Sequence, residues 1–237
     1  FSCDFEVETA ANGHQGMEQA LSCIPDIVVS DVMMPIMNGI TMCKMLKEDV
    51  RTSHIPIILL TAKDSLQDKE EGYQVGADSY LTKPFSATLL HSRINNLLES
   101  RKRLAERLNT NTPHHNMDEK RALLADSLNK LDNEFLEKIN RLIEDRLSSE
   151  KIDIGYLADN MCMSKSTLYR KMKALTGLST NEYVRKIKMQ YAERLLLEGR
   201  YNVSEIAFRV GINSVVYFRQ CFKEEFGVLP SDYLKQP

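Results

Sequence analysis

Short apolar runs alternate with helix-length segments through the first 105 residues, and this alternation limits the fold of that half most strongly. The runs at 27–30 and 55–60 are apolar at nearly every position, which is typical of strands covered on both faces. Further strands are predicted at 5–10 and 79–82, and helices at 13–22, 40–48, 67–75 and from 87 onward. Strands that alternate with helices form parallel βαβ units. The sequence therefore predicts an α/β fold with an open parallel sheet.

A polar residue directly follows each of the last three predicted strands. These residues are Asp31, Thr61 and Lys83. Active sites in open parallel sheets gather at the carboxyl ends of the strands, so the three side chains are expected at one edge. Together they suit phosphoryl transfer, because the carboxylate attacks phosphorus, the ammonium balances the new charge and the hydroxyl binds a phosphoryl oxygen. Pro84 follows the lysine, and a cis bond there would aim Lys83 inward.

The motifs DVMMPIMNG, ILLTA and GADSYLTKPF resemble the receiver domain of bacterial two-component response regulators, over roughly residues 1–105. The resemblance implies a flavodoxin-like sheet in which Asp31 is the phosphoacceptor and Thr61 and Lys83 sense the phosphoryl group. It implies that Tyr80 is an aromatic switch that moves inward behind Thr61. It also implies Mg²⁺, bound by Asp31 and by the backbone carbonyl of Met33.

The sequence departs from the receiver pattern at its start. Receivers begin with a strand that ends in an acidic pair, which completes the Mg²⁺ site, and this sequence begins after that strand. In the family the absent strand lies in the middle of the sheet. We therefore expect the chain to be a fragment of a longer polypeptide, with the acidic pair outside it.

Charge divides the chain into an acidic and a basic part. Residues 1–150 contain 17 Lys and Arg against 24 Asp and Glu, whereas residues 151–237 contain 14 against 9. The basic part indicates a polyanionic partner. The polar stretch NTNTPHHN is the strongest linker signal, and apolar residues from 124 to 147 keep helical spacing, as a packing face or a dimer seam would. We expect a receiver domain, a linker with a connector helix, and a second domain at 1–108, 109–131 and 132–237.

The second domain contains an internal repeat. Residues 154–183 resemble 203–233 at an offset of 49 before a turn and 50 after it. Each copy is expected to form a short helix, a tight turn and a longer helix capped by Ser164 or Ser214. This pattern predicts two DNA-binding helix-turn-helix motifs, at about 154–177 and 203–227. A helix from 180 to 198 would space the two recognition helices for successive major grooves.

Helical spacing separates buried from outward positions in the two recognition helices. Leu168, Met172 and Leu175 are expected inside in the first, and Phe218 and Phe222 in the second. The outward residues suit DNA, because Arg can pair with guanine, Lys with phosphate and Val with thymine methyl groups. The candidate contacts are Lys165, Ser166, Tyr169, Arg170, Lys173, Asn213, Ser214, Val215, Val216, Arg219 and Gln220.

The paired motifs LADNMCMSKSTLYRKMKALTG and VSEIAFRVGINSVVYFRQCFKEEFGVLPSDYL resemble the AraC-type DNA-binding domain, over residues 130–237. A receiver joined to such a domain also resembles the cytoplasmic end of hybrid two-component sensors. The combination implies a transcription regulator controlled by phosphorylation of Asp31. The expected partners are double-stranded DNA, a cognate histidine kinase in trans or on the same polypeptide, a second copy of the active chain, and RNA polymerase.

Two alternatives stay open at this point. The chain could be a phosphorylation-independent DNA-binding protein whose receiver serves as a dimerisation module, or the C-terminal portion of a membrane-bound hybrid histidine kinase. A phosphatase using an aspartyl phosphate would need a second acid two residues after the nucleophile, where this sequence has Met33. We therefore expect no enzymatic activity in this chain, although a longer parent could include a histidine kinase.

Cysteine usage and hydropathy indicate the compartment. Five widely spaced cysteines without a C-x-x-C pair argue against a disulfide framework and a zinc site. No apolar run approaches the roughly 18 residues that span a bilayer. We expect a cytoplasmic chain, membrane-tethered if it belongs to a hybrid sensor.

Overall fold

Three of the predicted strands form a parallel sheet, as their alternation with helices predicts. In the computed structural model, which describes residues 5–62, 75–109, 128–148 and 152–233, the strands are β1 (Val28–Asp31), β2 (Ile57–Thr61) and β3 (Ser79–Thr82). They pair in the order β1-β2-β3, all parallel. The predicted strand at 79–82 has the observed bounds, and the other two are shifted by one or two residues.

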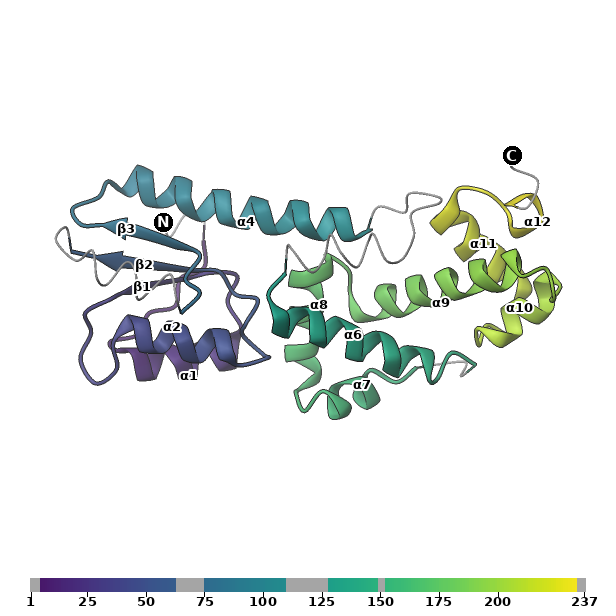
Figure 1. Ribbon diagram of the computed structural model, residues 1–237, viewed down its shortest axis with the longest axis horizontal. Helices are drawn as coiled ribbons and strands as arrows, with labels where there is room; N and C mark the ends of the chain where they lie inside the picture. The colour runs from purple at the N-terminus through teal and green to yellow at the C-terminus, as the bar shows by residue number, and fades with distance from the viewer. Residues whose placement is uncertain (1–4, 63–74, 110–127, 149–151, 234–237) are drawn as a thin grey trace. The chain divides into compact units, whose positions relative to one another are not determined.

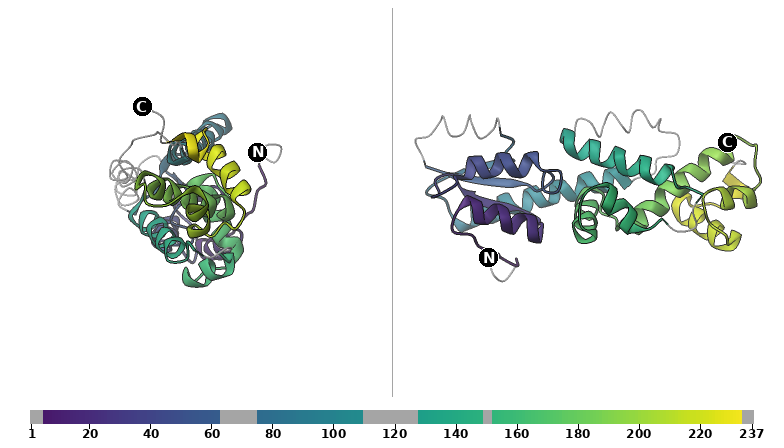
Figure 2. Two further views of the ribbon diagram at one scale, coloured as in Figure 1. Left: turned by 90° about the vertical axis from the view of Figure 1, so that its right-hand side faces the viewer. Right: turned by 90° about the horizontal axis from the view of Figure 1, so that it is seen from below.

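Helices cover both faces of this sheet. Helices α1 (Gly13–Cys23) and α2 (Gly39–Glu48) lie together on one face, and α4 (Ala87–Asn109) lies on the other (Figures 1 and 2). One apolar cluster joins α1 and α2 to β1 and β2, and a second, containing Ile58, Leu81 and Ile94, joins α4 to the opposite face. Both clusters are close to fully buried, which explains why β2 is apolar at every position before its last residue, Thr61.

The prediction of a strand at residues 5–10 is wrong. No strand is present before α1 in the described part of the chain, and Phe5 instead packs against the Ile58 cluster with its ring beside His91, 5.6 Å between centroids. A strand needs a neighbour to satisfy its backbone N–H and C=O groups, and these residues pair with none of the three strands. The predicted helix at 67–75 falls almost entirely outside the described residues.

Asp78, within the GADSYLTKPF motif, joins several elements at the amino end of the sheet. Its Oδ2 accepts hydrogen bonds from Lys47 Nζ of α2 at 2.6 Å and from the Ile57 backbone N–H of β2 at 2.9 Å. Its Oδ1 accepts from Arg101 of α4 at 3.1 Å. A largely buried carboxylate with this many donors fixes the relative positions of strands and helices, so this motif residue has a structural role.

The described residues divide into two compact units. The first contains the sheet and residues 128–132, and the second runs from 133 onward. The helices beyond α4 are α6 (Lys130–Glu144), α7 (Ile154–Asn160), α8 (Lys165–Thr176), α9 (Thr180–Leu197), α10 (Val203–Arg209), α11 (Val215–Phe226) and α12 (Pro230–Tyr233).

The first turn of α6 belongs to the first unit through a buried polar contact. Ser53 Oγ donates to Asp132 Oδ1 at 2.7 Å, and both residues are fully buried. Asn129 donates to Asp132 Oδ2 at 2.8 Å and to the Ser53 carbonyl at 3.0 Å. The donors offset the cost of burying this carboxylate.

The rest of α6 is built into the second unit. Phe135, Ile139 and Ile143 are at most 1% exposed, so the apolar stripe of the sequence is a packing face there. Tyr183 of α9 donates through its hydroxyl to Asn140 Oδ1 at 2.9 Å. Burial raises the pKa of Tyr183 to about 12, although the hydrogen bond to Asn140 lowers it.

The internal repeat of the sequence is a repeat of structure. Ser164 and Ser214 cap α8 and α11 by accepting from the backbone N–H three residues on, as predicted. Gly177 and Gly227 end the same helices in the left-handed region, at φ 70° and 78°. The inner side chains are those that the sequence predicts, each at most 3% exposed: Leu168, Met172, Leu175, Phe218 and Phe222.

Helix α9 separates the two copies. It packs against α8 of the first copy and against α10 and α11 of the second copy. Helix α8 lies toward one end of α9, and α10 and α11 lie toward the other end (Figure 1). A capping box of Ser179 and Glu182 starts the helix. Eighteen residues span about 27 Å, which approaches the roughly 34 Å between successive major grooves.

Candidate phosphoacceptor site and nucleic-acid interface

The sheet brings the three predicted polar residues to one edge. Asp31 is the last residue of β1 and Thr61 the last of β2, and Lys83 follows the last residue of β3. The strands are in register there, with Asp31 opposite Leu60 and Thr61 opposite Thr82. Lys83 Nζ forms an ion pair with Asp31 Oδ2, and the peptide bond from Lys83 to Pro84 is cis, as the sequence suggested. The predicted convergence of these groups is therefore present.

The loop after Asp31 is held by a close approach between backbones. Gly39 begins α2 directly against β1, and a Cβ added there would lie 2.1 Å from the Asp31 carbonyl oxygen. The Gly39 N–H donates to the Val32 carbonyl at 2.9 Å, and Asn38 caps α2 by accepting from Thr41 N–H at 2.7 Å. Glycine ends the DVMMPIMNG motif because no side chain fits at that contact.

Thr61 and the hydroxyl group of Tyr80 are buried in the first unit. Thr61 is 1% exposed, and Tyr80 packs against the apolar cluster of α1, α2 and β2 with its hydroxyl buried. The Tyr80 side chain therefore lies within this cluster, and its role as a switch residue stays a prediction. In contrast, Met33 is 77% exposed and Ile36 is 85% exposed, so the loop beside Asp31 is open to solvent.

The described residues around Asp31 supply a limited set of ligands for Mg²⁺. This ion usually takes one or two carboxylates, with waters and phosphate oxygens completing an octahedron. Asp31 offers one carboxylate and Met33 a backbone carbonyl. No group of three or more His, Cys, Asp or Glu that could hold a metal occurs among the residues the structure describes. The donors fit part of a Mg²⁺ site, with no second carboxylate among them.

The outer face of α8 carries the first set of predicted DNA contacts. Lys165, Ser166, Tyr169, Arg170 and Lys173 are all exposed. Lys173 also donates through Nζ to the Gly177 carbonyl at 2.7 Å, so it caps the C-terminus of the helix in this conformation. The exposed basic side chains lie along one face, which is the arrangement that backbone and base contacts to DNA require.

The outer face of α11 differs from the prediction at two positions. Val216 is 78% exposed, but Val215 is partly buried against the core of the second unit, so only one of the two valines faces outward. Tyr217 is 50% exposed and was not predicted as a contact, because helical spacing was assigned from Phe218 and Phe222 alone. Asn213, Ser214, Arg219 and Gln220 are exposed as expected, although the Ser214 hydroxyl is used as the cap.

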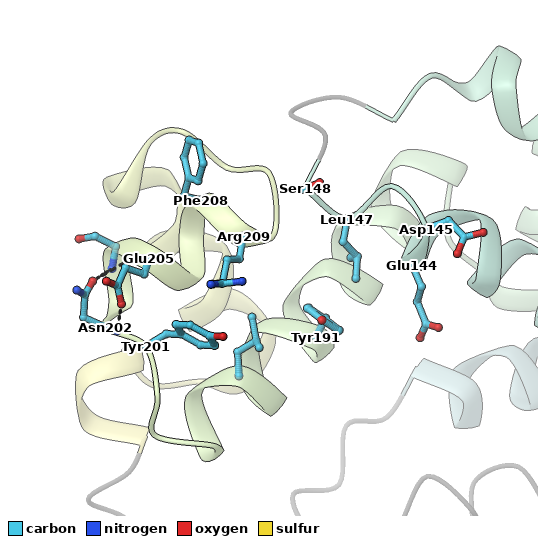
Figure 3. A pocket seen from close by; sticks show the side chains of 12 residues that line it. Glu144, Asp145, Leu147, Ser148, Tyr191, Tyr201, Asn202, Glu205, Phe208 and Arg209 are labelled. Carbon is cyan, nitrogen blue, oxygen red and sulfur yellow. Dashed lines mark hydrogen bonds between the residues drawn. The ribbon is translucent and has the colours of Figure 1, made fainter.

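A pocket of about 880 Å³ lies between α6, α9 and α10, away from every predicted site residue. Its wall includes Leu147, Tyr191 and Tyr201, and the Arg209 guanidinium stacks on the Tyr201 ring at 3.9 Å (Figure 3). Phe208 is 70% exposed at its rim. No motif in the sequence indicated this hollow, because its residues come from three helices and the loops next to them.

Comparison with known proteins gives a match for each half. Residues 2–95 match the family described as response regulator receiver domain, and residues 157–236 match a helix-turn-helix domain. Histidine kinase P4 of Formosa agariphila is 36% identical over 230 residues, which are 97% of this chain and 16% of that protein. The DNA-binding dual master transcriptional regulator RpaA of Synechocystis sp. is 38% identical over 102 residues, 43% of this chain and 42% of RpaA.

Solved structures resemble single parts of the chain. The C-terminal domain of AraT, a response regulator from Geobacillus stearothermophilus, is 30% identical with a TM-score of 0.39, covering 43% of this chain and 84% of that domain.

The chain contains a response regulator receiver domain followed by an AraC-type helix-turn-helix domain. It spans about a sixth of the length of the kinase that it matches. Among the described residues, no helix is both long and apolar enough to cross a membrane.

Proposed function

We propose that the chain is a sequence-specific DNA-binding transcription regulator whose DNA affinity is controlled by phosphorylation of Asp31. The observation that carries the proposal is the convergence of Asp31, Thr61 and Lys83 at one sheet edge, in a chain that also carries two exposed recognition helices. The first group of residues suits a phosphoryl group, and the second suits DNA.

The proposed reaction transfers a phosphoryl group from a histidine nitrogen of a kinase to a carboxylate oxygen of Asp31. The P–N bond breaks as the P–O bond forms, and the Lys83 ammonium, already paired with Asp31, moves to balance the phosphoryl charge. Thr61 donates its hydroxyl to a phosphoryl oxygen, and Tyr80 fills the space behind it. Receiver domains in general use Mg²⁺ for this reaction, and here Asp31 and the Met33 carbonyl would hold the ion, which neutralises crowded anionic oxygens.

The proposed DNA contacts divide by chemistry. Arg170 pairs with guanine, Lys165 and Lys173 bind phosphates, and Val216 contacts a thymine methyl group. Tyr217 joins this set because it is exposed beside Val216. The remaining contacts are Ser166, Tyr169, Asn213, Ser214, Arg219 and Gln220.

The proposed partners follow from the two domains. The chain receives phosphate from a cognate histidine kinase, in trans or on the same polypeptide, and binds double-stranded DNA in the cytoplasm as a homodimer that contacts RNA polymerase. The similarity to a histidine kinase over 97% of the chain supports the arrangement on one polypeptide. The domains would run from 1 to 108 and from 132 to 237, with a connector between them and no enzymatic activity of their own.

A second candidate function is phosphorylation-independent DNA binding, with the receiver acting as a dimerisation module. One observation bears on it: no group of three or more His, Cys, Asp or Glu that could hold a metal ion lies within the described residues. Two assays separate the candidates. The chain is first treated with acetyl phosphate and Mg²⁺, and labelling of Asp31 is measured by mass spectrometry, with Asp31→Asn as the unlabelled control.

DNA binding is then measured with and without the phosphodonor on duplexes selected from a random pool. Gated binding predicts that labelling raises the affinity of the wild type and leaves Asp31→Asn unchanged. Identical affinities for all four samples would exclude gating and favour the dimerisation module. In the same assay Arg170→Ala should lose about 1–3 kcal/mol on the selected sequence and relax base preference at one position. An equal loss on every sequence would make Arg170 a phosphate contact.

A further inference from the structure

The two recognition helices share their backbone but differ in how their exposed side chains are held. In α11, Gln220 Nε2 donates to Glu224 Oε1 at 3.0 Å, one helical turn further on. The other carboxylate oxygen of Glu224 lies 3.8 Å from an Arg185 guanidinium nitrogen of α9. Gln220 is therefore the first of three joined side chains, the first two on α11 and the third, Arg185, on α9.

The contact with Glu224 determines which way the Gln220 amide faces. An ionised carboxylate only accepts hydrogen bonds, so the amide atom beside it has to be the nitrogen. The amide keeps its carbonyl oxygen and a second N–H for another partner. A carbonyl and an N–H of one amide are the pair that binds N6 and N7 of adenine in the major groove.

Arg185 reduces the electrostatic cost of placing the Glu224 carboxylate on a helix face that is proposed to contact DNA. An isolated Glu224 would repel phosphates, whereas a guanidinium next to it offsets the charge. Tyr217, the exposed side chain beside Val216, also favours the charged form of Arg185 and so raises its pKa. Burial lowers the pKa of Arg185, but its interactions with Tyr217, Cys221 and Glu224 together hold the pKa above its ordinary value. Arg185 therefore stays charged.

The first copy has different residues at the two positions that correspond to Gln220 and Glu224. At the offset of 50, Arg170 stands in place of Gln220 and Ala174 in place of Glu224. Arg170 presents a fork of donors, which suits guanine, whereas Ala174 carries no carboxylate that could correspond to that of Glu224. The second copy has a residue suited to adenine and a carboxylate to orient it.

We propose that Gln220 reads an adenine and that Glu224, held by Arg185, is the positioning residue that orients it. This assignment rests on the proposed DNA-binding function and specifies which base the second helix-turn-helix recognises. Glu224 contacts no base itself. Its contribution is to immobilise the Gln220 side chain before DNA arrives, which lowers the ordering cost of the contact.

The test is selection of preferred sequences from a random duplex pool by the full chain, for the wild type and for Gln220→Ala, Glu224→Ala and Glu224→Gln. The wild type should enrich adenine at one position, and Gln220→Ala should lower that preference roughly 5-fold or more. Glu224→Ala should lower it roughly 2- to 10-fold at the same position only. Glu224→Gln should restore most of it, since its carbonyl oxygen also accepts from Gln220.

A control variant removes a carboxylate elsewhere in the same unit. Asp159→Asn, on the exposed side of α7, should leave the adenine preference unchanged. The proposal is overturned if Glu224→Ala keeps the wild-type preference, or if Gln220→Ala changes a position that is not adenine. If the wild type enriches no sequence at all, the DNA-binding function itself fails and this assignment with it. A uniform gain of affinity in Glu224→Ala, without a change in base preference, would also overturn the proposal. It would show that Glu224 acts on DNA binding only through its negative charge.

Discussion

Substituting Gly39 tests how tightly the phosphoacceptor strand and α2 are joined. A Cβ at this position would lie 2.1 Å from the Asp31 carbonyl oxygen, whereas ordinary contacts begin at 3.4 Å. The backbones of β1 and α2 must then separate by roughly 1 Å in Gly39→Ala, because neither partner is a flexible side chain. Overpacking of this kind costs about 1–3 kcal/mol, and a contact between two backbones belongs at the upper end of that range.

A matched control exists within the same unit. Gly16 lies in α1, and a Cβ there would come 2.8 Å from Met42 Sδ, the flexible part of a side chain. Both substitutions place Ala in a helix, which alone favours folding by up to about 1 kcal/mol. Gly16→Ala should therefore be near neutral, while Gly39→Ala should destabilise the first unit by about 2 kcal/mol.

The two variants are compared by hydrogen exchange of peptides from β1, β2 and β3, since the chain contains no tryptophan to report unfolding. Exchange in these strands should become faster in Gly39→Ala only, by roughly 30-fold for 2 kcal/mol if exchange follows opening of the whole unit. Labelling of Asp31 by acetyl phosphate should fall as well, because the carboxylate moves with its own backbone. Equal exchange in the two variants would refute the argument from the close approach.

Three further outcomes are expected from the structure. Ile36 has φ 67° and is 85% exposed, and Asn tolerates the left-handed region better than Ile does. Ile36→Asn should therefore raise the free energy of unfolding by about 1 kcal/mol, measured by denaturant titration. An unchanged free energy of unfolding would contradict this. Burial raises the pKa of Cys43 to about 11, so iodoacetamide at pH 8 should label exposed Cys162 first and Cys43 only on unfolding, as mass spectrometry would show. Asp132→Ala should cost about 1–3 kcal/mol in the same titration because Ser53 loses its acceptor in a buried site, and a neutral result would show that water replaces the carboxylate.

Local patterns predicted the parts of the structure that depend on neighbours in sequence. The spacing of Leu168, Met172 and Leu175 correctly predicted which side of α8 is buried, and Ser164 correctly predicted where the helix begins. The sequence also placed Asp31, Thr61 and Lys83 at one edge, because parallel strands of similar length end together. These predictions needed only helical period, capping chemistry and strand direction.

Contacts between distant segments were not predictable in the same way. The alternating residues 5–10 satisfied the pattern of a strand, but a strand also depends on a partner, which no local pattern reports. Asp78 was read as part of a phosphorylation motif, and its bonds to Lys47 and Arg101 appear only once the sheet has formed. Ser53 and Asp132 are 79 positions apart and carry no motif at all.

The duplication shows which residues determine the fold and which leave room for specificity. The two copies agree at both ends of the longer helix: a serine caps its start and a glycine in the left-handed region ends it. They even share a left-handed residue in the turn, Cys162 at φ 55° in one copy and Gly211 at φ 65° in the other, 49 positions on. The extra residue of the second copy follows at once, where it alters the turn without disturbing either helix. The outward positions differ almost throughout, so the repeated residues account for one shared scaffold, and the unrepeated ones, Gln220 and Glu224 among them, are free to select different bases.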